Sequence, residues 1–540
     1  MRRTAFAALL GAACATACGP AVLGINVDLV TRACPGATAA DASRDPAAGL
    51  TKLRFRVTGD GMQPQTVTVD FAGGSAQLPN IPIGVNRRVT VDALAGSRLR
   101  ARADSGKFDA LGPGDVHVRL FLRAVDAFTT TGNASASACT HLSTPRAGHA
   151  MTLLEDGRVL ISGGYTFDGS TPPKLQYHDE AELFDPQTGE FTALPASPVV
   201  RRAGHTALAV TGPGGVGVLL AGGEGPSGQA GNGPVTAIKP FELWLGGVWS
   251  TVVPPAASPS REHQAAAVDL KTGFALLVGG QNGPDATGVP VYDTATYYQP
   301  SGNAVKDVAE RLRAGPLTDA VAVAHANLRF GLTRGGVVIV GGRDANGAVS
   351  SQISGLQWSD SANDFVDDPD LRTLPPLPSP RAHHFAVRLR DDTVLTAGGL
   401  KSMTLPPDYS NATNEITVID PQGGSVRNIG QLSQGRADAC GALLEDGSVL
   451  IAGGAWRDGT GAHSAHQADV ITSDGNVRSP IGPQAGGADG TLQAARHRAA
   501  CVRLRDGSVL VTGGLQFPAS GSGTPIPLDS AEIYMPVGAP

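Results

Sequence analysis

The sequence predicts an all-β protein with two parts, a small domain of alternating strands followed by a long array of repeated sheets. A four-residue apolar run followed by two glycines recurs seven times between residues 159 and 514. Glycine accounts for 71 of the 540 residues, close to double the average usage, whereas aromatic residues make up only 5%. This composition is typical of short strands joined by many tight turns.

The first 18 residues resemble an export signal, because two arginines precede an apolar run that is too short to span a bilayer. The run ends in a stretch that resembles a bacterial lipobox, in which Cys18 would carry the lipid; Cys14 is the alternative. Cleavage before Cys18 leaves an even number of thiols, as an oxidising compartment favours: Cys34, Cys139, Cys440 and Cys501. We therefore expect an exported lipoprotein of the bacterial outer membrane or cell surface, with a periplasmic or secreted protein as the alternative. Its contact with the membrane would be through the lipid only.

Residues 20–128 lack the repeat and contain period-two runs separated by Gly, Pro, Asn and Asp. The runs are INVDLV (25–30), KLRFRV (52–57), QTVTVDF (65–71), RRVTVDAL (87–94) and HVRLFLR (117–123). Short strands at this spacing predict a β-sandwich. The segment resembles the immunoglobulin-like spacer domains of bacterial surface lipoproteins.

The seven repeats start at intervals of 55 to 62 residues, a period that indicates stacked supersecondary units. They are VLISGG (159–164), VLLAGG (218–223), ALLVGG (275–280), VVIVGG (337–342), VLTAGG (394–399), VLIAGG (449–454) and VLVTGG (509–514). Each unit predicts four strands, which we call a to d. In the first unit, residues 145–164 supply strand a, an Asp156-Gly157 hairpin turn and strand b, and residues 180–195 supply strands c and d.

Strand b is apolar on both faces, so each predicted sheet must be covered on both sides, as it would be if the sheets packed around an axis. With its glycine pairs, the Phe184-Asp185-Pro186 and Ile419-Asp420-Pro421 motifs of strand c, and Phe191 or Trp249 in strand d, the chain resembles a kelch-repeat β-propeller. The resemblance covers residues 130–540 and implies a seven-bladed propeller.

The b–c connections are long and differ from one another, and diverse loops on a rigid scaffold are where recognition usually occurs. We therefore expect a non-enzymatic binding or scaffold protein whose b–c face recognises a protein or a glycan, with no cofactor. The net charge of −6 argues against nucleic acid as a partner.

Strand a opens with a repeated arginine, and in four repeats a histidine lies close by. This candidate binding face comprises Arg146, His149, Arg202, His205, Arg261, His263, Arg381, His384, Arg436 and Arg496. Two interpretations are open: an anion-binding ring at the mouth of the axis, or buried arginines that bond backbone carbonyls and hold the sheets together. A metal site is less favoured, because equivalent positions in different blades are separated by the channel.

The alternative function is a secreted carbohydrate-active or oxidase-type enzyme, because galactose oxidase and its relatives share this propeller. Their copper-radical site requires tyrosines, histidines and a cysteine at the channel mouth. Here the tyrosines Tyr292, Tyr297, Tyr298 and Tyr534 are predicted in or beside strand c, away from the axis. We therefore expect no catalytic residues and no metal site.

Two further features concern how the array is held together. Cys440 lies six residues before Asp446 and Cys501 five residues before Asp506, so the two point to opposite faces of adjacent blades. They would form either a disulfide between blades 6 and 7 or two buried free thiols. The last repeat has no strand d, and we expect residues 134–142 to pair with residues 531–535 and complete blade 7.

Overall fold

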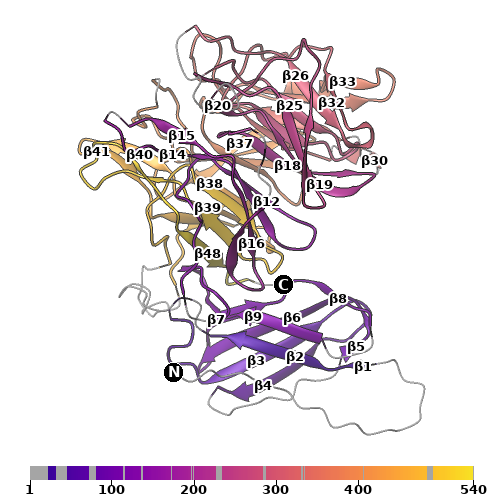
Figure 1. Ribbon diagram of the computed structural model, residues 1–540, viewed down its shortest axis with the longest axis vertical. Coiled ribbons are helices and arrows are strands. Elements are labelled where there is room, and N and C mark those ends of the chain that lie inside the picture. The colour runs from indigo at the N-terminus through magenta and orange to yellow at the C-terminus, as the bar shows by residue number, and fades with distance from the viewer. Residues whose placement is uncertain are drawn as a thin grey trace.

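The computed structural model describes the chain except for residues 1–21, 32–33, 35–44, 72–80, 113–115, 136–137, 172, 196–197, 199, 227–233, 284–287, 327, 330–331, 334, 405–406, 473, 483–489 and 539–540. The predicted export signal, with Cys14 and Cys18, lies outside the described residues. Figure 1 shows an N-terminal unit below a larger array of sheets. Strands dominate both parts, which confirms the all-β prediction, and the described residues form only two short 3-10 helices, η1 (Pro300–Gly302) and η2 (Pro369–Thr373).

The N-terminal unit consists of sheets that share one apolar core. Its largest sheet has the order β10-β7-β6-β3-β4, with β8 also paired to β6. These strands are β3 (Lys52–Thr58), β4 (Gln65–Asp70), β6 (Gly84–Ala95), β7 (Arg98–Asp104), β8 (Phe108–Ala110) and β10 (Arg123–Ala124). A parallel pair, β2 (Ile25–Val30) with β9 (Val116–Phe121), and a short pair, β1 (Val22–Leu23) with β5 (Ile81–Pro82), complete the unit. Alternate residues of β3, such as Leu53 and Phe55, pack in one core with Val27 of β2 and Leu120 of β9.

The described residues after the N-terminal unit form seven four-stranded antiparallel sheets, which we number 1 to 7. Sheet 1 comprises β12 (Ala150–Leu153), β13 (Val159–Ser162), β16 (Ala181–Asp185) and β17 (Glu190–Ala193); sheet 2, β18 (Thr206–Gly212), β19 (Gly215–Ala221), β22 (Phe241–Leu245) and β23 (Val248–Val252); sheet 3, β24 (Ala265–Val268), β25 (Ala275–Val278), β26 (Ala295–Gln299) and β27 (Ala304–Asp307); sheet 4, β28 (Val321–Ala324), β31 (Val337–Val340), β32 (Ile353–Ser359) and β33 (Asp364–Asp367). Sheet 5 comprises β34 (Phe385–Arg388), β35 (Val394–Ala397), β36 (Glu415–Asp420) and β37 (Ser425–Gln431); sheet 6, β38 (Cys440–Leu443), β39 (Val449–Ala452), β42 (Ala468–Ile471) and β43 (Val477–Arg478); sheet 7, β44 (Ala500–Arg503), β45 (Val509–Thr512), β48 (Ala531–Met535) and β11 (Ala127–Thr130).

The seven sheets follow one another around an axis in a propeller-like arrangement. Their first strands, β12, β18, β24, β28, β34, β38 and β44, contact one another in that order, and β44 also contacts β12. Because each sheet has a neighbour on either side, the second strand, such as β13, is buried along its whole length.

The glycine pair forms a link to the next sheet. Both glycines have positive φ, at 58° and 98° for Gly163 and Gly164, a conformation that glycine adopts without strain. Gly164 N donates to the carbonyl of Arg202 at 2.8 Å, and a Cβ at Gly163 would collide with that same oxygen. The glycines are thus required where one sheet packs on the backbone of the next.

Sheet 7 is completed by a strand from upstream of the array, but not by the one that the sequence predicts. The outer strand is β11, where Ala127 to Thr130 pair with Met535 to Glu532. The prediction that residues 134–142 occupy this place is wrong. Ala134 and Thr140 instead lie against the turn between β16 and β17 of sheet 1, where Ala134 N donates to Thr188 O at 2.9 Å and Thr140 Oγ1 donates to Gly189 O at 2.7 Å. The site requires apolar side chains, and Phe128 supplies one that is fully buried against Tyr534.

The N-terminal unit packs against the a–b turns of sheets 6 and 7. Arg88 binds Asp104 of its own unit at 2.8 Å and Glu445 of the sheet 6 turn at 2.9 Å. Arg102 donates to Val537 O at 2.8 Å. A disulfide between Cys34 and Cys139 adds a covalent connection. The opposite face of the array, where the b–c connections emerge, lies away from these contacts.

Candidate ligand-binding face

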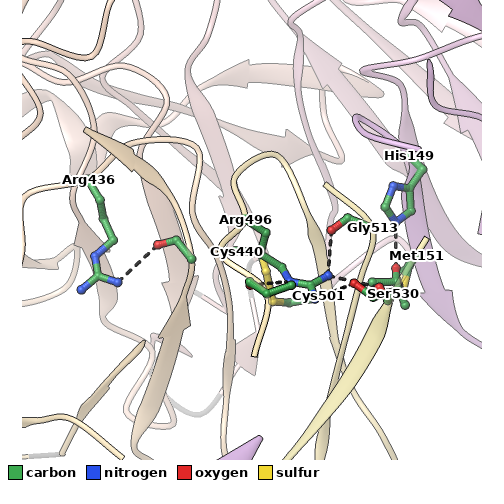
Figure 2. The surroundings of a disulfide bond; sticks show 11 residues. His149, Met151, Arg436, Cys440, Arg496, Cys501, Gly513 and Ser530 are labelled. Carbon is green, nitrogen blue, oxygen red and sulfur yellow. Dashed lines mark hydrogen bonds between the residues drawn. A yellow bond between two sulfur atoms is a disulfide. The ribbon is translucent and has the colours of Figure 1, made fainter. Parts of the chain in front are cut away.

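The repeated arginines of strand a are buried inside their own sheets. Arg202 donates to Gly222 O at 3.1 Å and to Glu242 at 2.7 Å, and Arg496 donates in the same way to Gly513 O at 2.8 Å and to Glu532 at 2.6 Å. The six, each at most 3% exposed, are Arg146, Arg202, Arg261, Arg381, Arg436 and Arg496. Figure 2 shows Arg496 turned toward Gly513 and Ser530, and Arg436 in the neighbouring sheet. Of the two interpretations that the sequence leaves open, the geometry agrees with the second: the guanidinium groups are enclosed by their own strands b and c and bond backbone carbonyls there.

Three of the four histidines contact the preceding sheet. His149 and His205 bond Thr512 Oγ1 and Ser162 Oγ through Nε2 at 2.8 and 2.9 Å (Figure 2 shows the first of these). Burial, reinforced by Arg146, lowers the pKa of His149 to about 3, and burial also lowers the pKa values of His205 and His384 well below 6.5. These three histidines are neutral packing groups that connect the sheets. His263 differs, because it stands one position closer to its arginine.

The position two residues after each arginine forms a ring at the end of the axis. We call these residues the mouth ring: Gly148, Gly204, His263, Asp319, His383, Asp438 and Arg498, with Leu317 in place of the arginine in sheet 4. All seven have left-handed backbone, with φ between 52° and 61°. Backbone bonds join neighbours around the ring: Arg498 N donates to Asp438 O at 2.9 Å, and Asp438 N to His383 O at 3.0 Å.

The side chains of the mouth ring form an arc of alternating charge. Asp319 lies 2.9 Å from His263 Nδ1 and 3.6 Å from His383 Nε2. His383 Nδ1 lies 2.9 Å from Asp438, which also accepts from Arg498 Nε at 3.0 Å. Arg343 binds Asp319 from outside the arc at 2.6 Å. Five side chains from five successive sheets are thereby held in one network.

Burial and neighbouring charges shift the pKa values of this network in opposite directions. Burial by itself would raise the pKa of Asp438, but Arg498 and His383 hold it well below its usual range. Burial by itself would lower the pKa of His383, but Asp438 and Asp319 raise it above 6.5. The carboxylates are therefore ionised at neutral pH, and His383 holds its proton more strongly than a free histidine does.

A hollow of about 320 Å³ opens within the mouth ring. Gly148 and Gly204 border the hollow, and a Cβ added at Gly204 would meet nothing within 4 Å. Tyr165, Glu224 and Glu262 also line it, together with His149 and His205 of the predicted binding face. We call this space the mouth hollow.

The b–c connections surround the mouth hollow as additional hairpins. Four of these are β14 (Tyr165–Phe167) with β15 (Leu175–Tyr177), β20 (Glu224–Pro226) with β21 (Val235–Ala237), β40 (Ala455–Asp458) with β41 (Gly461–Ser464), and β46 (Leu515–Gln516) with β47 (Ile526–Pro527). Figure 1 shows β14, β15, β20, β40 and β41 on the side of the array away from the N-terminal unit. Tyr165 and Glu224 begin two of these hairpins and also line the hollow, so hairpins and hollow form one face.

A disulfide lies directly behind the mouth ring. Cys440 in β38 and Cys501 in β44 are bonded, with 5.5 Å between their Cα atoms (Figure 2). Ala439, the neighbour of Cys440, and Ala499, two residues before Cys501, line the mouth hollow. The bond therefore joins sheets 6 and 7 at the site.

The sequence predictions include one member of the charged arc, His263, and do not include Asp319, His383, Asp438 and Arg498. These residues share no residue type; what they share is a fixed place after the repeated arginine and a left-handed backbone. Aligning the repeats on the arginine would have shown that this column carries His, Asp or Arg in five of seven repeats.

The part of the chain that the structure describes contains no group of three or more His, Cys, Asp or Glu side chains arranged to hold a metal ion. Within the same residues, no helix has the length and apolar character needed to cross a membrane.

The comparisons with known proteins do not assign the chain to a family. No family model matches the chain, and no curated protein matches it. Among solved structures, the chain is similar to one titled "Structure of YjhT", with 17% sequence identity and a TM-score of 0.44, over 63% of this chain and 98% of that one.

Proposed function

We propose that this protein is an exported, lipid-anchored binding protein, a seven-bladed kelch-type propeller carried by an immunoglobulin-like domain. It recognises a glycan or a protein of the cell envelope through the b–c face and carries out no catalysis. Lipid on Cys18 attaches it to the membrane.

The observation that carries the proposal is that the two faces of the array, where the a–b turns and the b–c connections emerge, have different surroundings. The N-terminal unit contacts the a–b turns of sheets 6 and 7 through Arg88, which binds Glu445 and donates to Asp506 O, and the segment after β48 through Arg102. The opposite face carries the hairpins and the mouth hollow. A chain anchored at its N-terminus through that unit would direct this face away from the membrane.

The test is capture of ligands on a glycan array and by cross-linking from envelope extracts, with the purified full-length protein. Leu175 of β15 is 41% exposed on the b–c face, and Val248, at the turn between β22 and β23, is 66% exposed on the other face. A charge placed in a contact surface disfavours the complex, because it must be desolvated without a partner. Leu175→Arg should therefore weaken capture, and Val248→Arg should leave it unchanged. The reverse pattern would place recognition on the other face.

A metal analysis tests the non-catalytic part of the proposal. Tyr297, Tyr298 and Tyr534 are at most 2% exposed, in β26 and β48, and none of the three lines the mouth hollow. Tyr165 does line it, but the nearby Cys440 and Cys501 are bonded to each other. Stoichiometric copper in the purified protein, together with oxidation of alcohols, would overturn the proposal in favour of an oxidase.

A further inference from the structure

We infer that the mouth hollow binds one unit of an uncharged ligand with several neighbouring hydroxyl groups, such as a single neutral sugar residue. This inference rests on the proposed function, because it assigns a ligand class to the centre of the b–c face.

The size and accessibility of the hollow fit a small ligand. Its volume of about 320 Å³ lies at the lower end of the range for small-molecule sites. The space lies on the side of the ring where Gly148 and Gly204 have no side chain. The other five ring positions all carry long or branched polar groups. The ligand would therefore lie beside the two glycines and face the charged arc.

The charge balance of the lining favours an uncharged ligand. Arg498 and His263 have side chains that are 29% and 25% exposed, and both are already paired with aspartates. The hollow is also lined by Glu224 and Glu262, so that carboxylates are at least as numerous as cations around it. An anion is bound by an excess of positive charge, which this lining does not offer.

The alternating donors and acceptors of the arc match hydroxyl groups. A guanidinium only donates and an ionised carboxylate only accepts, whereas one hydroxyl can do both. Asp438 and Arg498 lie 3.0 Å apart, so two adjacent hydroxyls of one ligand could engage this pair together. Tyr165, which is 6% exposed, adds part of an aromatic ring to the same lining.

Backbone strain indicates that the arc is maintained for its side chains. A left-handed conformation is unfavourable for residues with a Cβ, and glycine would relieve it, as it does in sheets 1 and 2. Five positions nevertheless carry His, Asp or Arg. Strain kept at several equivalent positions around one cavity points to a function of those side chains.

The experiment titrates the full-length protein with glucose, galactose and mannose, with glucuronate and glucosamine as charged counterparts, followed by calorimetry and ligand-observed NMR. The blocking variants are Gly204→His and Gly204→Asp. Both residue types already occupy this backbone conformation in other sheets, so either variant fills the hollow with an accepted side chain. The control is Gly246→Asn, at a φ of 59° with nothing within 4 Å of its Cβ, on the opposite face. Thermal unfolding shows which variants are folded.

We expect at least one neutral hexose to bind, and its affinity to fall by about tenfold or more in both Gly204 variants but not in Gly246→Asn. Three results would overturn the inference: no binding of any hexose up to roughly 50 mM, preference for the charged sugars, or hexose binding that both Gly204 variants preserve. Capture from envelope extracts that depends on Leu175 but survives Gly204→His would defeat this inference and leave the proposed function intact. Capture that is insensitive to Leu175→Arg would instead count against the proposed function.

Discussion

At the scale of residues, the most informative repeated position is a buried arginine whose partners lie in its own sheet. Arg202 bonds a backbone carbonyl of the glycine pair and the carboxylate of Glu242 in strand c. Both partners are buried, so the arginine supplies hydrogen bonds to polar groups that water does not reach. The sequence shows the repetition of this residue, but the identity of its partners depends on strand pairing across 40 residues.

We predict that Arg202→Ala lowers the free energy of unfolding by about 3–5 kcal/mol, because it breaks a buried ion pair with the Glu242 carboxylate. Denaturant unfolding monitored by circular dichroism measures the change. Arg158→Ala is the control: Arg158 is 43% exposed and pairs with Asp156, so its loss should change stability by less than about 1 kcal/mol. Replacing Arg202 and Glu242 together by leucine should recover much of the loss. Equal effects of Arg202→Ala and Arg158→Ala would contradict the assignment.

A second residue-scale prediction concerns pH. The pKa of His383 is raised in the folded protein because Asp438 and Asp319 outweigh burial and Arg498. A raised folded pKa contributes stability that is fully present below the unfolded value of about 6.5 and is lost as pH rises through the folded value. His383→Gln should therefore cost more stability at pH 5.5 than at pH 8.5. The lowered pKa values of buried His149 and His205 give stability the opposite pH dependence, and they do so equally in the wild type and in His383→Gln. The difference in stability between the two proteins therefore reports on His383 alone. A difference independent of pH would contradict the prediction.

At the scale of elements, the sequence predicts the repeated strands well, since strands c and d follow their motifs and strand b ends at each glycine pair. The pairing of Cys440 with Cys501 depends on how adjacent sheets face each other, and for this reason the sequence left a disulfide and free thiols as alternatives. The structure places the bond between the first strands of sheets 6 and 7, next to the mouth hollow. The mouth ring was largely missed, because a shared backbone conformation is not visible in residue types.

We predict that Cys440→Ala with Cys501→Ala destabilises the protein by about 2–4 kcal/mol, since the bond closes a loop with a sequence separation of 61 residues. Amide exchange should accelerate first in β38 and β44. Cys34→Ala with Cys139→Ala is the matched control, because that disulfide lies outside sheets 6 and 7 and its loss should leave exchange in those strands unchanged. Indistinguishable exchange patterns for the two variants would contradict a local role for the Cys440 bond.

At the scale of the whole molecule, the ring closes through a strand that directly follows the N-terminal unit. β10 ends at Ala124 and β11 begins at Ala127, so the strand that completes sheet 7 is tied to the first unit by two residues. Between them, Asp126 accepts from Tyr534 and from Arg478, each at 2.8 Å, and so binds the connection to sheets 6 and 7. The sequence prediction placed closure too late, because the buried apolar pair Ala127 and Phe128 decides which segment enters the sheet.

Because β11 completes sheet 7, we predict that the array stays assembled after the chain is cut within residues 134–142, the segment that the sequence predicts in that place. A protease site inserted after Ser135, which is exposed, separates β11 from sheet 1 while leaving the pairing of β11 with β48 intact. After cleavage the two pieces remain joined by the Cys34–Cys139 disulfide, so reduction is needed to test the noncovalent contacts. We expect the cleaved and reduced protein to elute as one complex in size-exclusion chromatography, because Phe128 stays buried against Tyr534 and the Asp126 bonds persist.

Phe128→Ala removes the buried ring at a cost of about 3–5 kcal/mol, and in the cleaved, reduced protein it should release the N-terminal piece. If the pieces separate without that substitution, the noncovalent contacts of β11 do not hold sheet 7 closed.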